Sequence, residues 1–240
     1  MIFTISARSK PKDVPVLDFL QISYPEINLS DVDSVFGFVE KSTLYGGRQF
    51  VEPELNDDDV KQLNKNRIGL RIPFTNHYAT KEEYIENREL LEKYHKKGNA
   101  VIATNDGLAK WIRNDFPKYR IEASVIKNIN THDKIIEAME IYDTVVLPMN
   151  LNQNLEFLKK TKNKKRITLF ANAGCALNCP SKICYPSTSK YNKFQGDEFK
   201  CSQTLKYRKL NGMIDFDLEE LVGIGFSRFK LLRSRGKTGF

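Results

Sequence analysis

Short apolar runs alternate with amphipathic stretches along the whole chain. Most of the runs are four to seven residues long and rich in Ile, Val, Leu and Phe, which is typical of strands buried on both faces. A further strand is expected to begin at Ile2. The runs cover residues 18–24, 34–39, 68–74, 100–104, 120–125, 144–147, 166–170 and 226–232.

Between these runs lie stretches whose apolar residues recur at the three- and four-residue intervals of a helix. The clearest case is 80–97, where Thr80 and Glu83 form a capping box and Gly98 supplies the exit. A second helix is predicted over 106–115, with Pro117 just beyond its end. Further helices are predicted over 131–142, 152–160 and 217–221.

The alternation of strand and helix predicts an α/β fold with a parallel sheet covered by helices. About eight units in 240 residues favour one (β/α)₈ TIM-like barrel domain over residues 1–240. An open doubly wound parallel sheet is the runner-up, but no Gly-rich phosphate loop follows the first strand. In a barrel, the functional residues lie where the strands end.

Composition narrows the class of protein. A hydrophobic content of 40% is that of a globular chain. No apolar run is long enough to span a bilayer, and the N-terminus lacks the order of regions typical of a secretory signal. We therefore expect a cytoplasmic protein without a membrane partner, in which thiols stay reduced.

The four cysteines are the strongest chemical signal in the sequence. They read Cys175-x3-Cys179-x4-Cys184-x16-Cys201, in a predicted loop over 172–201 that follows the seventh strand. Four thiolates suit one closed metal site. A [4Fe–4S] cluster is favoured because three cysteines lie close together and one is distant, whereas zinc sites prefer two close pairs. Zinc, or buried thiols without a metal, remain alternatives.

Charge is distributed unevenly. The net charge is +8, yet residues 151–240 carry +11 and residues 1–150 carry −3. The run 159–166 holds six cations, but in a barrel it joins a helix to a strand on the face away from the site. Cations mixed with aromatic rings around the cysteines suit phosphate contacts and base stacking. The predicted nucleic-acid-binding residues are Lys182, Tyr185, Lys190, Tyr191 and Lys193.

Polar residues at strand ends are candidates for catalysis. They are Arg71, Asn105, Asp106, Glu122 and Asn172. Each has a structural alternative: Asn105 and Asp106 can cap a helix, and Glu122 can pair with Arg71 inside the barrel.

Hydrolase chemistry gains little support from the sequence. No HExxH motif and no Ser/His/Asp or Cys/His pair is evident, so a protease is not expected. Of the three histidines, His77 follows a strand end and is the one that could reach a pocket.

The order of several segments resembles the collagenase-like "peptidase" family. The resemblance rests on the stretch AVIATNDGLAKWIRNDFPKYRIEASVIKNI, including its I-x-A-S element at 121–124, and on the strand 143–147. It also rests on the segment LFANAGCALNC, which leads up to and contains the first cysteine, and on the closing strand 227–231. The cysteine spacing here is more compact than is usual in that family.

The resemblance implies a barrel with an iron–sulfur cluster on Cys175, Cys179, Cys184 and Cys201. It also implies a role in oxygen-independent hydroxylation or a related modification of RNA or a small molecule, with an electron donor or a heterodimeric partner. The local cations favour RNA or another nucleic acid as substrate. A metal-stapled nucleic-acid-binding or partner module without catalysis, or a small-molecule hydroxylase subunit, is the alternative.

Overall fold

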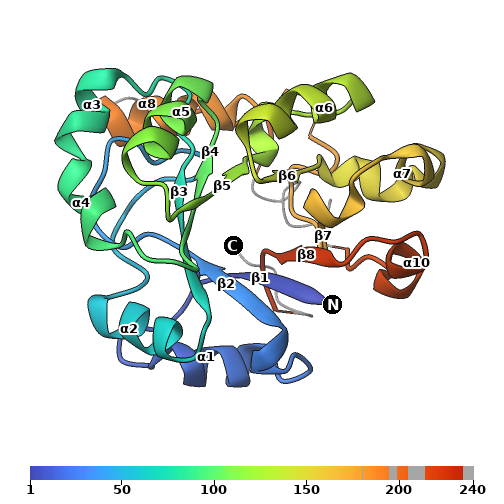
Figure 1. The fold of residues 1–240 in the computed structure, drawn as a ribbon, viewed down its shortest axis with the longest axis horizontal. Coiled ribbons are helices and arrows are strands. Elements are labelled where there is room, and N and C mark those ends of the chain that lie inside the picture. The colour runs from blue at the N-terminus through green and yellow to red at the C-terminus, as the bar shows by residue number, and fades with distance from the viewer. Residues whose placement is uncertain (180, 195–198, 205–213, 235–240) are drawn as a thin grey trace.

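Eight parallel strands close into a barrel in a computed structural model that describes residues 1–179, 181–194, 199–204 and 214–234. Each strand pairs with the next in sequence, and β1 pairs with β8 to complete the ring (Figure 1). The (β/α)₈ prediction is therefore confirmed. The strands are β1 (Ile2–Ser6), β2 (Val32–Phe36), β3 (Gly69–Phe74), β4 (Ala100–Ala103), β5 (Arg120–Ala123), β6 (Thr144–Val146), β7 (Ile167–Phe170) and β8 (Arg228–Leu231).

Helices surround the barrel and bury their apolar faces against it (Figure 1). They are α1 (Val16–Ser23), α2 (Asp57–Lys65), α3 (Lys81–Glu86), α4 (Arg88–Lys93), α5 (Asp106–Asp115), α6 (His132–Ile141), α7 (Leu155–Lys160), α8 (Cys184–Phe194) and α10 (Leu218–Gly223). Short 3₁₀ turns lie at Leu29–Asp31, Val125–Lys127, Met149–Gln153 and Lys164–Arg166. Among the described residues, no helix is both long and apolar enough to cross a bilayer.

The start of the chain differs from the prediction. The strand expected at Ile2 forms and becomes β1, whereas residues 18–24 fold as helix α1 rather than as a strand. The reason is the spacing of the buried residues: Val16, Phe19 and Leu20 recur at three- and four-residue intervals and face the core. The barrel still has eight strands, because the strand at Ile2–Ser6 takes the place of the strand expected at 18–24.

The helix predictions hold in part. The capping box of Thr80 and Glu83 is present, but the helix over 80–97 breaks at Asn87 into α3 and α4. Helix α5 has the predicted bounds. The cysteine-rich segment 172–201 was expected to be a loop, and its second half instead contains helix α8.

A buried ionic network spans the interior of the barrel. Glu122 on β5 pairs with Arg71 on β3, and its other oxygen lies 3.2 Å from Nζ of Lys230 on β8. Arg71 also donates to Asp33, 2.8 Å away. Because these strands are not neighbours, their side chains meet across the barrel axis. The pairing of Glu122 with Arg71 that the sequence allowed is thus confirmed.

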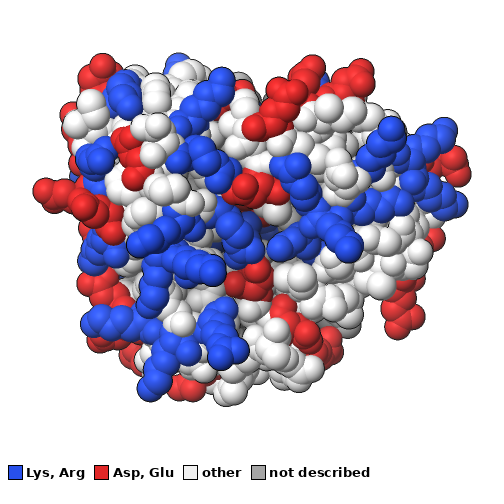
Figure 2. All heavy atoms as spheres, in the orientation of Figure 1, with Lys and Arg blue, Asp and Glu red and all other residues white. Residues whose placement is uncertain are grey.

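The basic run 159–166 lies at the opposite end from the strand termini that form the site. Lys and Arg side chains gather over α7 on the face shown in Figure 2. Arg166 donates to the carbonyl oxygens of Met139 and Tyr142, and Lys164 donates to that of Ile224. Part of the run therefore caps carbonyls at the ends of neighbouring segments.

Candidate metal centre at the mouth of the barrel

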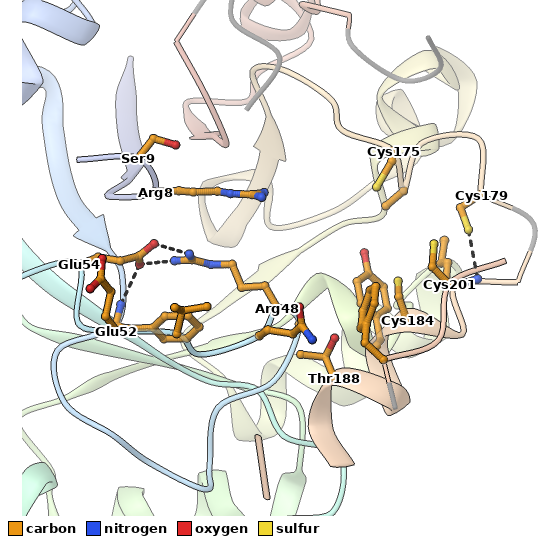
Figure 3. Close-up of a pocket in the computed structure, with 18 of the residues that line it drawn as sticks. Arg8, Ser9, Arg48, Glu52, Glu54, Cys175, Cys179, Cys184, Thr188 and Cys201 are labelled. Atoms are coloured by element: carbon orange, nitrogen blue, oxygen red, sulfur yellow. Dashed lines mark hydrogen bonds and ion pairs between the residues drawn. The ribbon is translucent and has the colours of Figure 1, made fainter. Parts of the chain in front are cut away.

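All four cysteines line one cavity of about 470 Å³ at the carboxyl ends of the strands (Figure 3). Cys175 and Cys179 lie in the segment that follows β7, Cys184 begins helix α8, and Cys201 lies beyond that helix. The compact spacing of the cysteines is thus matched by their proximity in space. The four thiols lie together on one side of the cavity in Figure 3, and no group of three or more His, Cys, Asp or Glu among the described residues converges as a ready-made site for one ion.

Helix α8 is fixed by hydrogen bonds to two loops of the barrel mouth. Asn192 donates to the carbonyl oxygens of Tyr45 and Arg48 and accepts from the N–H of Phe50 at 2.8 Å. Asn76, just after β3, donates to the carbonyl oxygen of Ser189 at 2.9 Å. These bonds hold the middle and the last turn of α8 against the barrel mouth, and the helix begins at Cys184, which lines the cavity.

The turn at 45–48 needs glycine where it passes β3. A Cβ on Gly46 would lie 2.4 Å from the carbonyl oxygen of Thr75, which is closer than any real contact. The turn that the sequence marks with Gly46 and Gly47 is therefore part of the cavity wall, and it carries Arg48 into the site.

Backbone N–H groups point at two of the sulfurs. The N–H of Lys182 lies 3.3 Å from Sγ of Cys179, and that of Gln203 lies 3.5 Å from Sγ of Cys201. Burial acts to raise the pKa of the Cys179 thiol, but the N–H groups of Lys182 and Ser181 outweigh it and lower the pKa. Such donors stabilise thiolate, which is the form that binds metals.

The thiol of Cys184 has the opposite character. Burial, followed by the proximity of Cys201, Cys175 and Cys179, raises its pKa to about 11. Like-charge repulsion among the four sulfurs makes four metal-free thiolates unfavourable. A bound cation or cationic cluster core relieves that repulsion, so the donor set suits a soft metal centre.

Cations line the rest of the cavity. Figure 3 shows the Arg8 side chain extending toward Cys175, while the guanidinium of Arg48 turns to form a bidentate pair with Glu54. Burial, and then Arg48, lower the pKa of Arg8, whereas Glu54 and Cys175 act to raise it. Positive charge beside the thiols is what a site holding several thiolates needs.

A second cavity of about 230 Å³ adjoins the first at the barrel axis. Its walls come mainly from strand ends, and its apolar lining includes Phe36, Ile102, Met149 and Phe170. Arg8, Arg48, Cys175 and Tyr185 line both cavities. A molecule in the barrel mouth would therefore lie next to the cysteines.

The five predicted catalytic residues lie outside both cavity walls. Arg71 and Glu122 are buried in the ionic network below the mouth. Asn172 donates to the carbonyl oxygen of Arg233 and accepts from the N–H of Leu232, so it ties the segment after β7 to β8. Their positions support structural roles, and a catalytic role for them stays a prediction that the geometry does not favour.

Asn105 and Asp106 act at the start of α5. The side chain of Asn105 accepts from the N–H of Leu108 at 3.0 Å, as an N-cap does. Asp106 accepts from Lys127 at 2.7 Å and from the hydroxyl of Tyr142 at 2.6 Å. The capping alternative is confirmed for Asn105.

Replacing Asn105 with alanine is expected to lower the free energy of unfolding by about 1 kcal/mol, because one N–H of the first helical turn loses its acceptor. Urea denaturation measures this change. Metal content per chain should stay that of the wild type, and a loss of metal at unchanged stability would contradict the capping role.

The histidines are also engaged in structure. His77 was expected to be able to reach a pocket, but it lines neither cavity, and its Nδ1 lies 3.1 Å from Oγ of Ser189. This Ser/His pair joins residues 112 positions apart and was not evident from the sequence. Ser189 is fully buried, and its hydroxyl donates to the carbonyl oxygen of Tyr185, so the pair anchors α8 rather than presenting a nucleophile.

The predicted nucleic-acid-binding residues separate into two sets. Tyr185 and Lys182 line the cysteine cavity. Lys190 is exposed near the ring of Tyr78, and Tyr191 is half-buried. Lys193 is paired with Glu83 at 3.0 Å. Lys182 and Lys190 are therefore the cations best placed for a polyanion at the mouth.

Sequence reasoning missed the cations of the cavity. Arg8 and Arg48 were not singled out, although Arg8 follows the first strand and Arg48 lies in a turn of the barrel mouth. The rule that strand ends carry function, applied to the strand expected at Ile2, would have nominated Arg8.

Comparison with known proteins adds one result to this geometry. The fold is similar to that of a U32 peptidase. The solved structure of the U32 peptidase Mk0906 matches with a TM-score of 0.65 and 13% identity, over 98% of this chain and 93% of that chain. At that identity the likeness shows the fold alone, and it agrees at that level with the collagenase-like family that the sequence resembles. No family model and no curated protein matches the chain.

Proposed function

We propose that Cys175, Cys179, Cys184 and Cys201 hold a [4Fe–4S] cluster, and that the protein is an oxygen-independent hydroxylase or related enzyme acting on RNA or another nucleic acid. One observation carries the proposal: the four thiols line a single cavity that opens onto the barrel mouth. Four thiolates that hold a cube each bond a different iron, so they surround a space instead of meeting at a point.

The neighbouring residues support this use of the site. N–H groups directed at Cys179 and Cys201 stabilise the ligating thiolates. Arg8 places a positive charge beside Cys175, which offsets the negative charge of a thiolate-bound centre. A bound cluster would supply electron transfer at the edge of the pocket. The apolar walls formed by Phe36 and Phe170 would orient a base or ring there and limit access of water.

Metal analysis after anaerobic purification tests the cluster. We expect about four irons and four sulfides per chain, with the broad visible absorption of an iron–sulfur protein and an EPR signal on reduction. A colourless protein with one tightly bound zinc would overturn the cluster and favour the metal-stapled module without catalysis.

Binding to single-stranded RNA tests the substrate class. Replacing Lys182 and Lys190 together with glutamine should weaken binding and reduce the slope of log K against log salt by about 1.4, because about 0.7 is lost per phosphate contact. The matched control replaces Lys162 and Lys165, which are exposed at the opposite end of the barrel. Equal effects of both pairs, or binding insensitive to salt, would count against an RNA substrate at the mouth.

A further inference from the structure

Lys230 is a buried amine beside the barrel-mouth cavity, and the proposed cluster chemistry does not use it. Its side chain is 7% exposed and lines the cavity of about 230 Å³. Nζ lies 3.2 Å from Glu122 and 4.5 Å from the centroid of the Phe36 ring, which also lines the cavity. A lysine in this setting faces one carboxylate, one aromatic ring and a space large enough for a small molecule.

The electrostatic setting favours loss of a proton from this amine. Burial lowers the pKa of Lys230, the ion pair with Glu122 opposes the change, and the nearby Arg71 lowers the pKa further. Glu122 is shared, because Arg71 also pairs with it. A lysine that is desolvated and close to another cation is a stronger nucleophile at neutral pH than a surface lysine.

The cavity also offers a place for an acid group. Arg233 lines the same cavity and is 6% exposed. Its Nε–H is buried with no hydrogen-bond acceptor among the described residues, although its terminal nitrogens reach Asp215 and two carbonyl oxygens. Arg8 adds positive charge to the lining of the same cavity, whereas the guanidinium of Arg48 is paired with Glu54. A ligand with an apolar body and a carboxylate would meet Phe36 and Phe170 with one part and the guanidinium groups with the other.

We propose that Lys230 forms an imine with a small oxo acid, an aldehyde or ketone that carries a carboxylate, bound in the barrel-mouth cavity. Lys230 first passes one proton to the Glu122 carboxylate 3.2 Å away, and the freed nitrogen lone pair then bonds to the carbonyl carbon. The carbonyl oxygen leaves as water with that proton and a second proton from the nitrogen, which restores the Glu122 carboxylate. The product is an iminium ion with the same single positive charge. The charge balance with Glu122 and the contact with the Phe36 ring are therefore kept.

Reductive trapping of the full chain tests the proposal. The protein is treated at pH 7 with 4-carboxybenzaldehyde or benzaldehyde, each with sodium cyanoborohydride, and the modified lysines are mapped by mass spectrometry of peptides. We expect Lys230 to be modified at least about ten times faster than Lys10, a lysine buried against Asp59 at 3.0 Å that serves as the internal comparison. The carboxylated aldehyde should react faster at Lys230 than benzaldehyde does.

The outcomes separate the parts of the proposal. Modification confined to surface lysines would overturn imine formation at Lys230. Fast modification of Lys230 with no advantage for the carboxylated aldehyde would overturn the acid-binding part.

Without reductant the mass increase should disappear on dilution, because an imine hydrolyses. Lys230→Arg should remove the fast reaction, and mapping of the wild type decides the matter if that variant does not fold. The result is independent of metal content, so it stands apart from the cluster test.

Discussion

Replacing Cys184 with serine is expected to abolish assembly of the proposed [4Fe–4S] cluster. Cys184 begins α8, and burial together with its three neighbouring thiols raises the pKa of its own thiol to about 11. A serine hydroxyl there stays protonated and cannot replace a soft thiolate ligand. Iron content after anaerobic reconstitution should fall from about four per chain to below about one, with loss of the visible absorption.

Ser202 provides the matched control. Its hydroxyl lies 3.9 Å from Sγ of Cys179, so it contacts the site without supplying a thiol. Ser202→Ala should keep the iron content and absorption of the wild type. If Cys184→Ser also kept them, the four-cysteine assignment would be wrong.

Replacing Glu122 with glutamine will be the most destabilising single change in the barrel interior. The carboxylate faces both Arg71 and Lys230, and all three side chains are almost completely buried. Removing one partner of a buried ion pair costs about 3–5 kcal/mol, because the remaining charge is left uncompensated away from water. Guanidinium chloride denaturation measures the loss. Asp58→Asn breaks the exposed pair with Lys61 and should cost at most about 1 kcal/mol.

The buried carboxylates of Glu122 and Asp33 make the free energy of unfolding depend on pH. Arg71 and Lys230 hold the pKa of Glu122 below its ordinary value against the effect of burial. Burial also acts to raise the pKa of Asp33, but Arg71 and Arg120 outweigh it and lower that pKa to about 2. Their stabilisation is present above the unfolded pKa, near about 4, and is lost as pH falls through the folded values. Glu122→Gln should lose less stability than the wild type between pH 5 and 2, and an equal loss would contradict this account.

The barrel was predictable from the sequence because short runs rich in apolar residues recur between helical stretches. The one strand assigned wrongly, 18–24, is a run of the same kind, with Gln21 and Ser23 between its apolar residues. A pattern of that length does not distinguish a strand from a helix until the helical spacing of Val16, Phe19 and Leu20 is seen packed. The cysteine site was likewise visible in the sequence, since the loop after β7 brings Cys175 and Cys179 to the mouth wherever the barrel forms.

The rest of the site depends on contacts between distant segments. Helix α8 starts with Cys184 and Tyr185 and has Pro186 in its first turn, a position that proline tolerates, but its apolar face is weak. It is held by Asn76 and Asn192, whose partners lie more than 100 residues away in sequence. The strand-end rule nominated Glu122 and Arg71 because it does not distinguish residues that point down the barrel from those that line its mouth.

Closure of the barrel between β1 and β8 also sets the order of events during synthesis. The two strands are separated by more than 220 residues, so at about 5–20 residues per second the ribosome needs on the order of ten to forty-five seconds after making β1 to deliver its partner. Cys201 is made before β8. Every thiol of the site therefore leaves the ribosome before β8 does, while the ring still has two open edges.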